Sequence, residues 1–375
     1  MMKIELKENN KIFLVNGRQN QEIHPLWLRE RANTEELVDQ LTKQRIYDPS
    51  TLNEKINIKK VKIDKIFLNI EFTDGIISKF KIIDLLNELD TETMMKGPVH
   101  QKIIWKNDLK EKPEAQYNND FNSKEIFETL KKFHEYGFVI IKNVPTKNNY
   151  IVDFANSIGT VRPTNFGIYF DVKSIPNYND LAYTPRHLLP HTDNPYRKPV
   201  PCIQLLHCIE NEVSGGYSTL VDGFAVSNYI KENFKEYFDI LTTTKVRFRF
   251  ADQEVILENW GELIELDDNE SLKQIRYNTK IEYVPHLDTK KLELFYNARK
   301  KMGELCCSKK FEIRFKLMKG DLLMMDNHRT LHGRTSYDPN EGMRHLQGCY
   351  IDYDSSEGKL MHLSRKFRMQ NESSQ

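Results

Sequence analysis

Residues 326–354 read "DNHRTLHGRTSYDPNEGMRHLQGCYIDYD", in which two strand candidates, RTLHGRTSY and MRHLQGCYIDYD, lie on either side of a turn. Short β-rich runs of this kind alternate with turns from about residue 165 onward, and two helical segments interrupt them. Many short strands without the spacing of parallel βαβ units are typical of a closed or double-sheet β fold. The sequence therefore predicts a mainly β protein with flanking helices.

The composition divides the chain into three parts. Residues 1–105 are rich in strand candidates and carry the hairpin signals Asn-Gly at 16–17 and Asp-Gly at 74–75. Residues 106–122 are polar and low in apolar side chains, which is typical of a linker. We therefore predict a small N-terminal β-rich domain at 1–105, a linker at 106–122 and a larger domain at 123–375.

The charge balance argues against several classes of partner. The 375 residues include 55 Lys and Arg against 54 Asp and Glu, so no net field would attract nucleic acid or an anionic membrane. The five cysteines are an odd number, which does not fit a disulfide framework. No apolar targeting segment or membrane-spanning run is visible. We expect a cytoplasmic protein that acts on a small molecule and binds neither nucleic acid nor membrane.

The segment "HTDNPY" (191–196) allows two interpretations. Asp-Asn-Pro is a turn-forming string. Alternatively, His191 and Asp193 would point to the same face of a strand and could bind one cation, with His332 as a third ligand from a distant strand. Two histidines and one carboxylate form the facial triad of non-haem Fe(II) oxygenases. Four other histidines are equally visible and are more simply explained as core or surface groups: His187, His207, His328 and His345.

Arg344 favours the metal interpretation. It follows His332 by twelve residues, across the turn SYDPNEG, so a hairpin would place it on the neighbouring strand. The planar guanidinium of an arginine near such a triad can bind the distal carboxylate of 2-oxoglutarate with two hydrogen bonds. If Arg344 faces the interior of the fold, alternation puts Tyr350 there as well, and the small Gly348 between them leaves room.

Two long motifs, "HTDNPYRKPVPCIQLLHCIENEVSGGYSTLVDGF" (191–224) and the 326–354 segment, resemble the gamma-butyrobetaine dioxygenase and trimethyllysine dioxygenase family, within the wider taurine dioxygenase-like group. The resemblance covers about residues 125–365, and "HPLWLR" (24–29) extends it to the family's N-terminal domain. It implies a double-stranded β-helix (jelly-roll) catalytic domain that uses Fe(II), 2-oxoglutarate and O2, with stimulation by ascorbate, and a homodimer.

The resemblance also assigns roles to residues at the metal. His191, Asp193 and His332 match the iron ligands, and Arg344 matches the arginine that binds 2-oxoglutarate. Ser218 or Thr219, in "GGYSTLVDG", would assist this arginine. The chemistry requires no catalytic side chain beyond the metal ligands.

The family's substrates carry a trimethylammonium group, which has no N–H to donate and is held by aromatic faces. This chain has Phe166 and Phe170 where family members often have Tyr or Trp, and Phe is the weaker partner for a cation. The simpler interpretation of each aromatic residue is a place in the core. The positions that match the family's substrate contacts are Phe166, Phe170, Asp180, Tyr183, Asn194, Asn278 and Tyr350.

The resemblance implies hydroxylation of an unactivated C–H bond, first of all the conversion of gamma-butyrobetaine to L-carnitine. Trimethyllysine and a trimethylaminoalkyl phosphonate are alternative substrates. The same three ligands could also hold zinc for hydrolysis, or the chain could be an inactive ligand-binding jelly roll. Arg344 argues against the hydrolase, because a hydrolase has no need to anchor 2-oxoglutarate.

The N-terminal domain departs from the family. Its relatives usually hold a structural zinc through cysteines that follow "HPLWLR", whereas this chain reads "ERANTEELVDQLTKQR" there, without cysteine. A zinc site of that kind needs thiolates. We therefore expect no N-terminal structural zinc, and apolar packing in its place.

Overall fold

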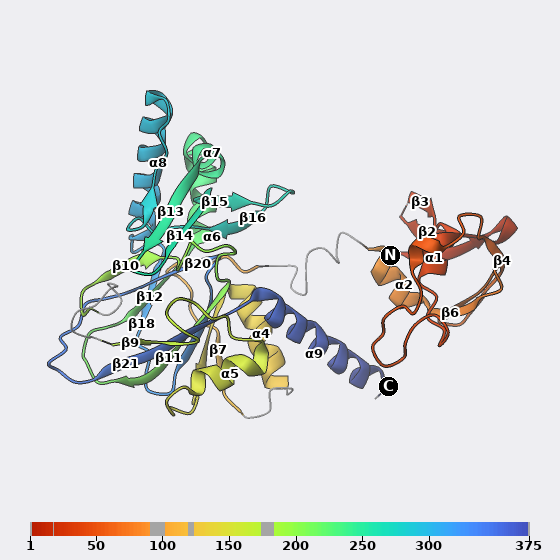
Figure 1. Ribbon diagram of the computed structural model, residues 1–375, viewed down its shortest axis with the longest axis horizontal. Helices are drawn as coiled ribbons and strands as arrows, with labels where there is room; N and C mark the ends of the chain where they lie inside the picture. The colour runs from red at the N-terminus through yellow and green to blue at the C-terminus, as the bar shows by residue number, and fades with distance from the viewer. Residues whose placement is uncertain (1, 18, 91–101, 119–123, 174–183, 374–375) are drawn as a thin grey trace. The chain divides into compact units, whose positions relative to one another are not determined.

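The computed structural model describes residues 2–17, 19–90, 102–118, 124–173 and 184–373 (Figure 1). The chain divides into two compact units, Met1–Gly97 and Pro98–Gln375. Within the described residues no helix is long and apolar enough to cross a membrane.

The described part of the N-terminal unit is built on two three-stranded antiparallel sheets, as its β-rich sequence predicts. Gly17 and Gly75 adopt positive φ angles at the Asn-Gly and Asp-Gly turns, a backbone conformation that favours glycine. The elements are β1 (Lys3–Lys7), η1 (Glu8–Asn10), β2 (Lys11–Asn16), β3 (Gln19–Glu22), α1 (Pro25–Glu30), η2 (Pro49–Thr51), β4 (Ile58–Asp64), β5 (Phe67–Phe72), β6 (Ile77–Lys81) and α2 (Ile82–Leu89).

The core of this unit is apolar and includes the stretch that follows α1. Ala32 and Leu37 are buried there together with Leu68 from β5. The guanidinium of Arg31 lies 3.7 Å from the centroid of the Trp27 ring. Apolar and cation–π contacts therefore pack α1 and the cysteine-free segment that follows it.

Two facing sheets form the centre of the second unit, which is a double-stranded β-helix as predicted. Their strands are antiparallel except for the outermost pair, β7 and β8. The larger sheet has the order β7 (Glu114–Gln116), β8 (Phe138–Lys142), β19 (Leu322–Asp326), β11 (Ile203–Asn211), β21 (Arg344–Ile351), β9 (Phe170–Val172). The smaller sheet has the order β10 (Leu188–His191), β20 (Thr330–Arg334), β12 (Ser218–Asp222), β18 (Glu312–Phe315).

Apolar side chains from both sheets meet between them. Leu220 and Phe315 of the smaller sheet share one buried cluster with Phe138, Leu323 and Leu346 of the larger sheet. β12 and β19 are buried along their whole length, and β19 has the almost unbroken apolar sequence that is expected of a strand covered on both faces. The two sheets are therefore held face to face.

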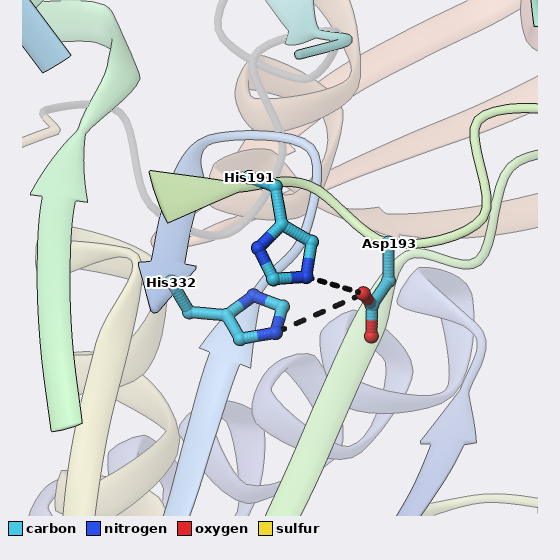
Figure 2. A group of neighbouring side chains, drawn as sticks. All are labelled: His191, Asp193 and His332. Carbon is cyan, nitrogen blue, oxygen red and sulfur yellow. Dashed lines mark ion pairs between the residues drawn. The ribbon is translucent and has the colours of Figure 1, made fainter. Parts of the chain in front are cut away.

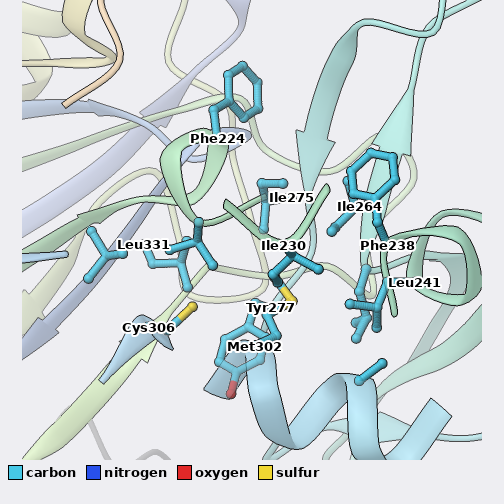
Figure 3. Packing of buried hydrophobic residues seen from close by; sticks show 14 of the residues in the cluster. Phe224, Ile230, Phe238, Leu241, Ile264, Ile275, Tyr277, Met302, Cys306 and Leu331 are labelled. Carbon is cyan, nitrogen blue, oxygen red and sulfur yellow. The ribbon is translucent and has the colours of Figure 1, made fainter. Parts of the chain in front are cut away.

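Helices cover the outer faces of the sheets. α4 (Lys124–Tyr136) and α5 (Tyr150–Ile158) pack on the larger sheet, and α9 (Tyr353–Ser373) packs on these two helices (Figure 1). A second apolar cluster joins the smaller sheet to three helices and two small sheets (Figure 3). These elements are α6 (Gly223–Asn233), α7 (Lys235–Thr243), β13 (Lys245–Ala251), β14 (Ile256–Glu262), β15 (Ile264–Leu266), β16 (Leu272–Ile275), β17 (Glu282–Tyr283) and α8 (Thr289–Cys306).

The boundary between the units differs from the one that the composition suggests. It follows Gly97 instead of residue 105. Trp105 is 3% exposed in the core of the second unit, where its indole N–H donates to the carbonyl of Tyr136. Within the expected linker, β7 adds a parallel strand beside β8. A polar segment can join a sheet edge in this way because backbone hydrogen bonds need no apolar side chains.

A buried ion pair connects the end of β12 to the turn between β19 and β20. The guanidinium of Arg329 donates to both carboxylate oxygens of Asp222, from Nη2 at 2.7 Å and from Nε at 3.1 Å. Both side chains are fully buried. Asp222 also accepts a hydrogen bond from the N–H of Phe224 and so caps α6.

We expect Arg329→Met to lower the free energy of unfolding by about 3–5 kcal/mol, because it leaves the Asp222 carboxylate buried without its cation. Lys235 and Asp239 provide a matched exposed pair, 2.8 Å apart. Lys235→Met should lower the free energy of unfolding by about 1 kcal/mol or less. Urea denaturation of both variants measures the difference, and equal small losses would contradict this account.

Acid should destabilise the protein through His134 of α4. Burial lowers the pKa of His134 to about 4, and its Nε2 lies 2.8 Å from Ser356 Oγ. The unfolded chain takes up a proton near pH 6.5, whereas the folded chain does so only near pH 4, so stability falls as pH drops through this window. His134→Gln should remove about 3 kcal/mol of this fall. Denaturation of the parent and of His134→Gln at pH 7 and pH 4 measures the free energies of unfolding. The same pH dependence in both proteins would count against this explanation.

Candidate metal centre and substrate pocket

Three side chains, His191, Asp193 and His332, converge in the second unit (Figure 2). His191, the last residue of β10, lies directly opposite His332 of β20 in the strand register. Oδ1 of Asp193 lies 3.3 Å from Nε2 of His191 and 3.7 Å from Nε2 of His332. Atoms that bind one ion at about 2.1 Å are separated by roughly 3–3.5 Å. Two imidazole nitrogens and one carboxylate oxygen at these distances fit a single Fe(II) ion.

Asp193 reaches this cluster by a different route from the one that strand alternation suggests. β10 ends at His191, and Asp193 lies in the turn that follows, where Asn194 has a φ of +52°. Asn327 fixes this turn, because its Oδ1 accepts from the N–H of Asp193 and its Nδ2 donates to the carbonyl. The turn and the metal interpretations of "HTDNPY" are therefore compatible, since the turn positions the ligand.

The surroundings of the three groups suit binding of a metal. Nδ1 of His191 lies 2.8 Å from the carbonyl of Leu189, which can only accept, so Nε2 carries the free lone pair. Burial lowers the pKa of His332 to about 4. Burial opposes ionisation of Asp193, but the nearby His332 and His191 and the hydroxyl of Tyr350 outweigh it and hold its pKa well below the usual range. At neutral pH His332 is therefore a neutral imidazole and Asp193 a carboxylate.

The ligands open into a cavity of about 440 Å³. Arg344 lines it from the start of β21 and is 6% exposed. Burial and the charge of Arg334 lower its pKa to about 10. Among the described residues, Nε and Nη1 of Arg344 have no hydrogen-bond partner. A buried cation with unused donors is suited to bind an anionic ligand.

The predicted hairpin between β20 and β21 was wrong. β20 lies between β10 and β12, whereas β21 lies between β11 and β9 on the other sheet. The connection 335–343 therefore crosses from the smaller sheet to the larger one. Arg344 still points into the cavity with His332, because the two sheets face each other.

The structure separates the two hydroxyl residues proposed to assist Arg344. Ser218 lines the cavity. Thr219 faces the other side of the strand, where its Oγ1 lies 2.7 Å from the position that a Cβ on Gly333 would take. Arg334, which the sequence patterns did not indicate, also lines the cavity. It lies opposite Ser218 in the strand register and donates to the carbonyls of Thr184 and Arg186. Its position two residues after His332 is a signal that could have found it.

Aromatic rings form one wall of the cavity. The rings of Phe170 and Tyr350 are 5.6 Å apart, and those of Phe166 and Phe170 are 6.5 Å apart. Phe250, which the sequence did not suggest, lies 5.8 Å from Phe166 and stacks on Tyr196. We call Phe166, Phe170, Tyr196, Phe250 and Tyr350 the aromatic wall. Two predicted substrate residues, Asp180 and Tyr183, lie outside the described residues.

Gly348 makes space for the aromatic wall. A Cβ at this position would lie 2.4 Å from Cζ of Phe170, so any side chain would displace the ring. Asn194 and Asn278 line the cavity as well. Nδ2 of Asn194 and Oδ1 of Asn278 have no hydrogen-bond partner among the described residues, which leaves them available to a ligand.

The other histidines lie apart from the cluster. His328 lies 3.2 Å from the carbonyl of Val200, and His345 lies 2.6 Å from Asp171. Burial lowers the pKa of His207 to about 4. Across the residues that the structure describes, His191, Asp193 and His332 are the one group of three or more side chains able to hold a metal.

Comparisons with known proteins agree with this geometry. A family profile described as "Taurine catabolism dioxygenase TauD, TfdA family" matches residues 107–350. The chain is 28% identical to the gamma-butyrobetaine dioxygenase of Pseudomonas sp. (strain AK-1), over 91% of this chain and 90% of that protein. It is 29% identical to the mitochondrial trimethyllysine dioxygenase of Mus musculus, over 88% of this chain and 80% of that protein.

The chain is also similar to a solved structure, at a lower sequence identity than to these two dioxygenases. The non-heme iron oxygenase OrfP, in complex with Fe and alpha-ketoglutaric acid, is 15% identical, with a TM-score of 0.49. The similarity covers 65% of this chain and 95% of that one.

Proposed function

Because the chain belongs to the taurine catabolism dioxygenase TauD, TfdA family, we propose that it hydroxylates a small quaternary-ammonium compound, and that this compound is gamma-butyrobetaine. The enzyme is a dioxygenase that uses Fe(II), with 2-oxoglutarate and O2 as co-substrates. The product from gamma-butyrobetaine would be L-carnitine. The family assignment sets aside the zinc hydrolase that the three ligands alone would allow.

The aromatic wall beside the metal ligands is the observation that supports this substrate. A trimethylammonium group cannot donate a hydrogen bond, and ring faces attract it through their quadrupoles. Phe170 and Tyr350 lie at such a wall in the cavity that contains His191 and His332. A cation held there would place its neighbouring C–H bonds near the metal.

The residues of the cavity have different roles in the proposed reaction. His191, Asp193 and His332 would hold Fe(II), which, when bound, supplies the activation of O2 that is coupled to decarboxylation of 2-oxoglutarate to succinate and to C–H hydroxylation. Arg344 would bind the distal carboxylate of 2-oxoglutarate and fix its direction. The buried side chains around the ligands exclude bulk water. We assign no acid or base beyond these roles.

A specific observation favours a second substrate, a trimethylaminoalkyl phosphonate. Arg249 and Lys280 line the same cavity as Asn278. Arg249 is already paired with Glu258 at 3.0 Å. The positive charges of Arg249 and Lys280 suit an anionic group at the end of the substrate opposite the trimethylammonium group. A phosphonate carries more negative charge than a carboxylate. Trimethyllysine stays a third candidate because of the 29% identity to a trimethyllysine dioxygenase.

The test compares three substrates with one another and gamma-butyrobetaine with an isostere that lacks its positive charge. Gamma-butyrobetaine, trimethyllysine and trimethylaminoethylphosphonate are supplied separately, together with 5,5-dimethylhexanoate, in which carbon replaces the cationic nitrogen of gamma-butyrobetaine. We expect the KM of this isostere to exceed that of gamma-butyrobetaine by roughly 10-fold or more, since the cation–π contribution of about 1–2 kcal/mol is lost. Equal KM values would reject a quaternary-ammonium substrate while leaving the oxygenase intact. A lower KM for the phosphonate would select the second candidate.

The assembly that goes with this proposal is a homodimer, which the resemblance to the family implies. Light scattering should then give twice the chain mass of 44.4 kDa. A mass equal to one chain would reject it.

A further inference from the structure

The two oxygens of the Asp193 carboxylate have different surroundings. In Figure 2 the dashed lines from both histidines end on the same oxygen of Asp193, which is Oδ1. Oδ2 accepts two hydrogen bonds, from Nε2 of Gln204 at 2.6 Å and from the hydroxyl of Tyr350 at 2.7 Å. Both donors are almost completely buried, at 2% and 3% exposure, so water does not compete for this oxygen.

The two donors come from the sheet that does not carry the histidines. Gln204 in β11 and Tyr350 in β21 are direct partners in the register of the larger sheet. His191 and His332 are direct partners in the smaller sheet. The carboxylate of Asp193 therefore spans the interior, with one oxygen toward each sheet. A one-residue shift between β11 and β21 would separate the two donors.

We propose that Gln204 and Tyr350 act as a pair of positioning residues that restrict Asp193 to binding the metal through Oδ1 alone. This inference rests on the proposed function, because it concerns the same metal site. Three ligand atoms leave three positions on a six-coordinate ion, and 2-oxoglutarate and O2 need all of them. If Oδ2 also bound the metal, it would occupy one of those positions. The carboxylate would have to rotate for Oδ2 to reach the metal, and this rotation would break both hydrogen bonds to Oδ2. The two hydrogen bonds therefore oppose it.

Tyr350 has a second contact, which the experiment has to separate from the first. Its ring is part of the aromatic wall, 5.6 Å from Phe170. Tyr350→Phe removes the hydroxyl and keeps the ring. Gln204→Met removes the other donor with little change in side-chain volume. Tyr196→Phe is the matched control, because its hydroxyl also faces the cavity but donates to Oδ1 of Asn194 instead of a metal ligand.

The measurement is binding of Co(II) to the full-length protein by calorimetry, together with the visible absorption spectrum of the Co(II)-loaded protein before and after 2-oxoglutarate is added. Each single variant should weaken Co(II) binding roughly 10-fold, and the double variant about 100-fold, as is typical when groups that hold a metal ligand are removed. The double variant should also show a changed Co(II) spectrum and a smaller response to 2-oxoglutarate. Tyr196→Phe should bind Co(II) within about twofold of the parent, since the hydroxyl that it removes donates to Asn194, which is not a ligand.

Co(II) affinities and spectra that are unchanged in Gln204→Met and Tyr350→Phe would overturn the proposal. If the double variant does not fold, the two single variants decide, because each leaves one donor on Oδ2. Equal losses in Tyr196→Phe would also overturn it, because they would reflect general disturbance of the cavity. Failure of the parent protein itself to bind Co(II) would instead reject the metal site and, with it, the proposed function.

Discussion

Replacement of Asp193 by alanine is expected to abolish metal-dependent turnover, with succinate formation and Fe(II) affinity each falling by roughly 1,000-fold or more. Loss of a residue that only supports a ligand already costs about 10–100-fold. Asp193 is a ligand itself, and it provides the one negative charge in the cluster of His191, Asp193 and His332. Without it two imidazoles remain, and they hold a divalent ion far more weakly.

Anaerobic titration with Fe(II) and a succinate assay measure the two effects. Asp171→Ala is a suitable control for the metal affinity. Asp171 is also a carboxylate near the cavity, but it is paired with His345 at 2.6 Å on the other face of the sheet. The account would be contradicted if Asp193→Ala bound Fe(II) as the parent does, or if Asp171→Ala lost Fe(II) to the same extent.

The second large effect is expected at Arg344. Arg344→Ala should raise the KM for 2-oxoglutarate about 100-fold, because two charge-assisted hydrogen bonds contribute roughly 3 kcal/mol in total. Arg344→Lys should recover part of this loss, since lysine keeps the charge but lacks the planar fork. Fe(II) affinity should stay close to that of the parent, because Arg344 is not a ligand.

The comparison of two oxoacids makes this prediction specific. 2-Oxobutyrate lacks the distal carboxylate, so its turnover should change little in Arg344→Ala while that of 2-oxoglutarate falls. Arg314→Ala, on the outer strand β18, is the control: its guanidinium pairs with Glu312 and is half exposed. A KM for 2-oxoglutarate that stays unchanged in Arg344→Ala would show that another group binds the distal carboxylate.

Much of the site could be predicted from short sequence patterns. His332 and Arg344 lie on strands whose alternation is clear, and alternation decides which side chains face the interior. The choice of sheet could not be predicted, because the turn 335–343 is compatible with a hairpin and with a crossing between sheets. The packing of the two sheets decides this, and no local pattern encodes it.

The residues that sequence reasoning missed depend on contacts between distant segments. Gln204 meets Asp193 because β11 pairs with β21 in the interior of the β-helix, and nothing within "PCIQLLHCIE" marks it. Phe250 joins the aromatic wall from β13, far from Phe166 in the sequence. The boundary after Gly97 was missed for a related reason: the burial of Trp105 depends on the partners it finds in the second unit.

The most direct test of the central claim is the ratio of succinate to hydroxylated product when the Fe(II)-loaded protein receives 2-oxoglutarate, O2 and gamma-butyrobetaine. The account predicts succinate and a product heavier by one oxygen atom in equal amounts, with both absent in Asp193→Ala. Succinate without hydroxylated product would leave a dioxygenase that acts on another substrate. The absence of succinate from the protein with Fe(II) bound, whichever quaternary-ammonium compound is supplied, would contradict the account.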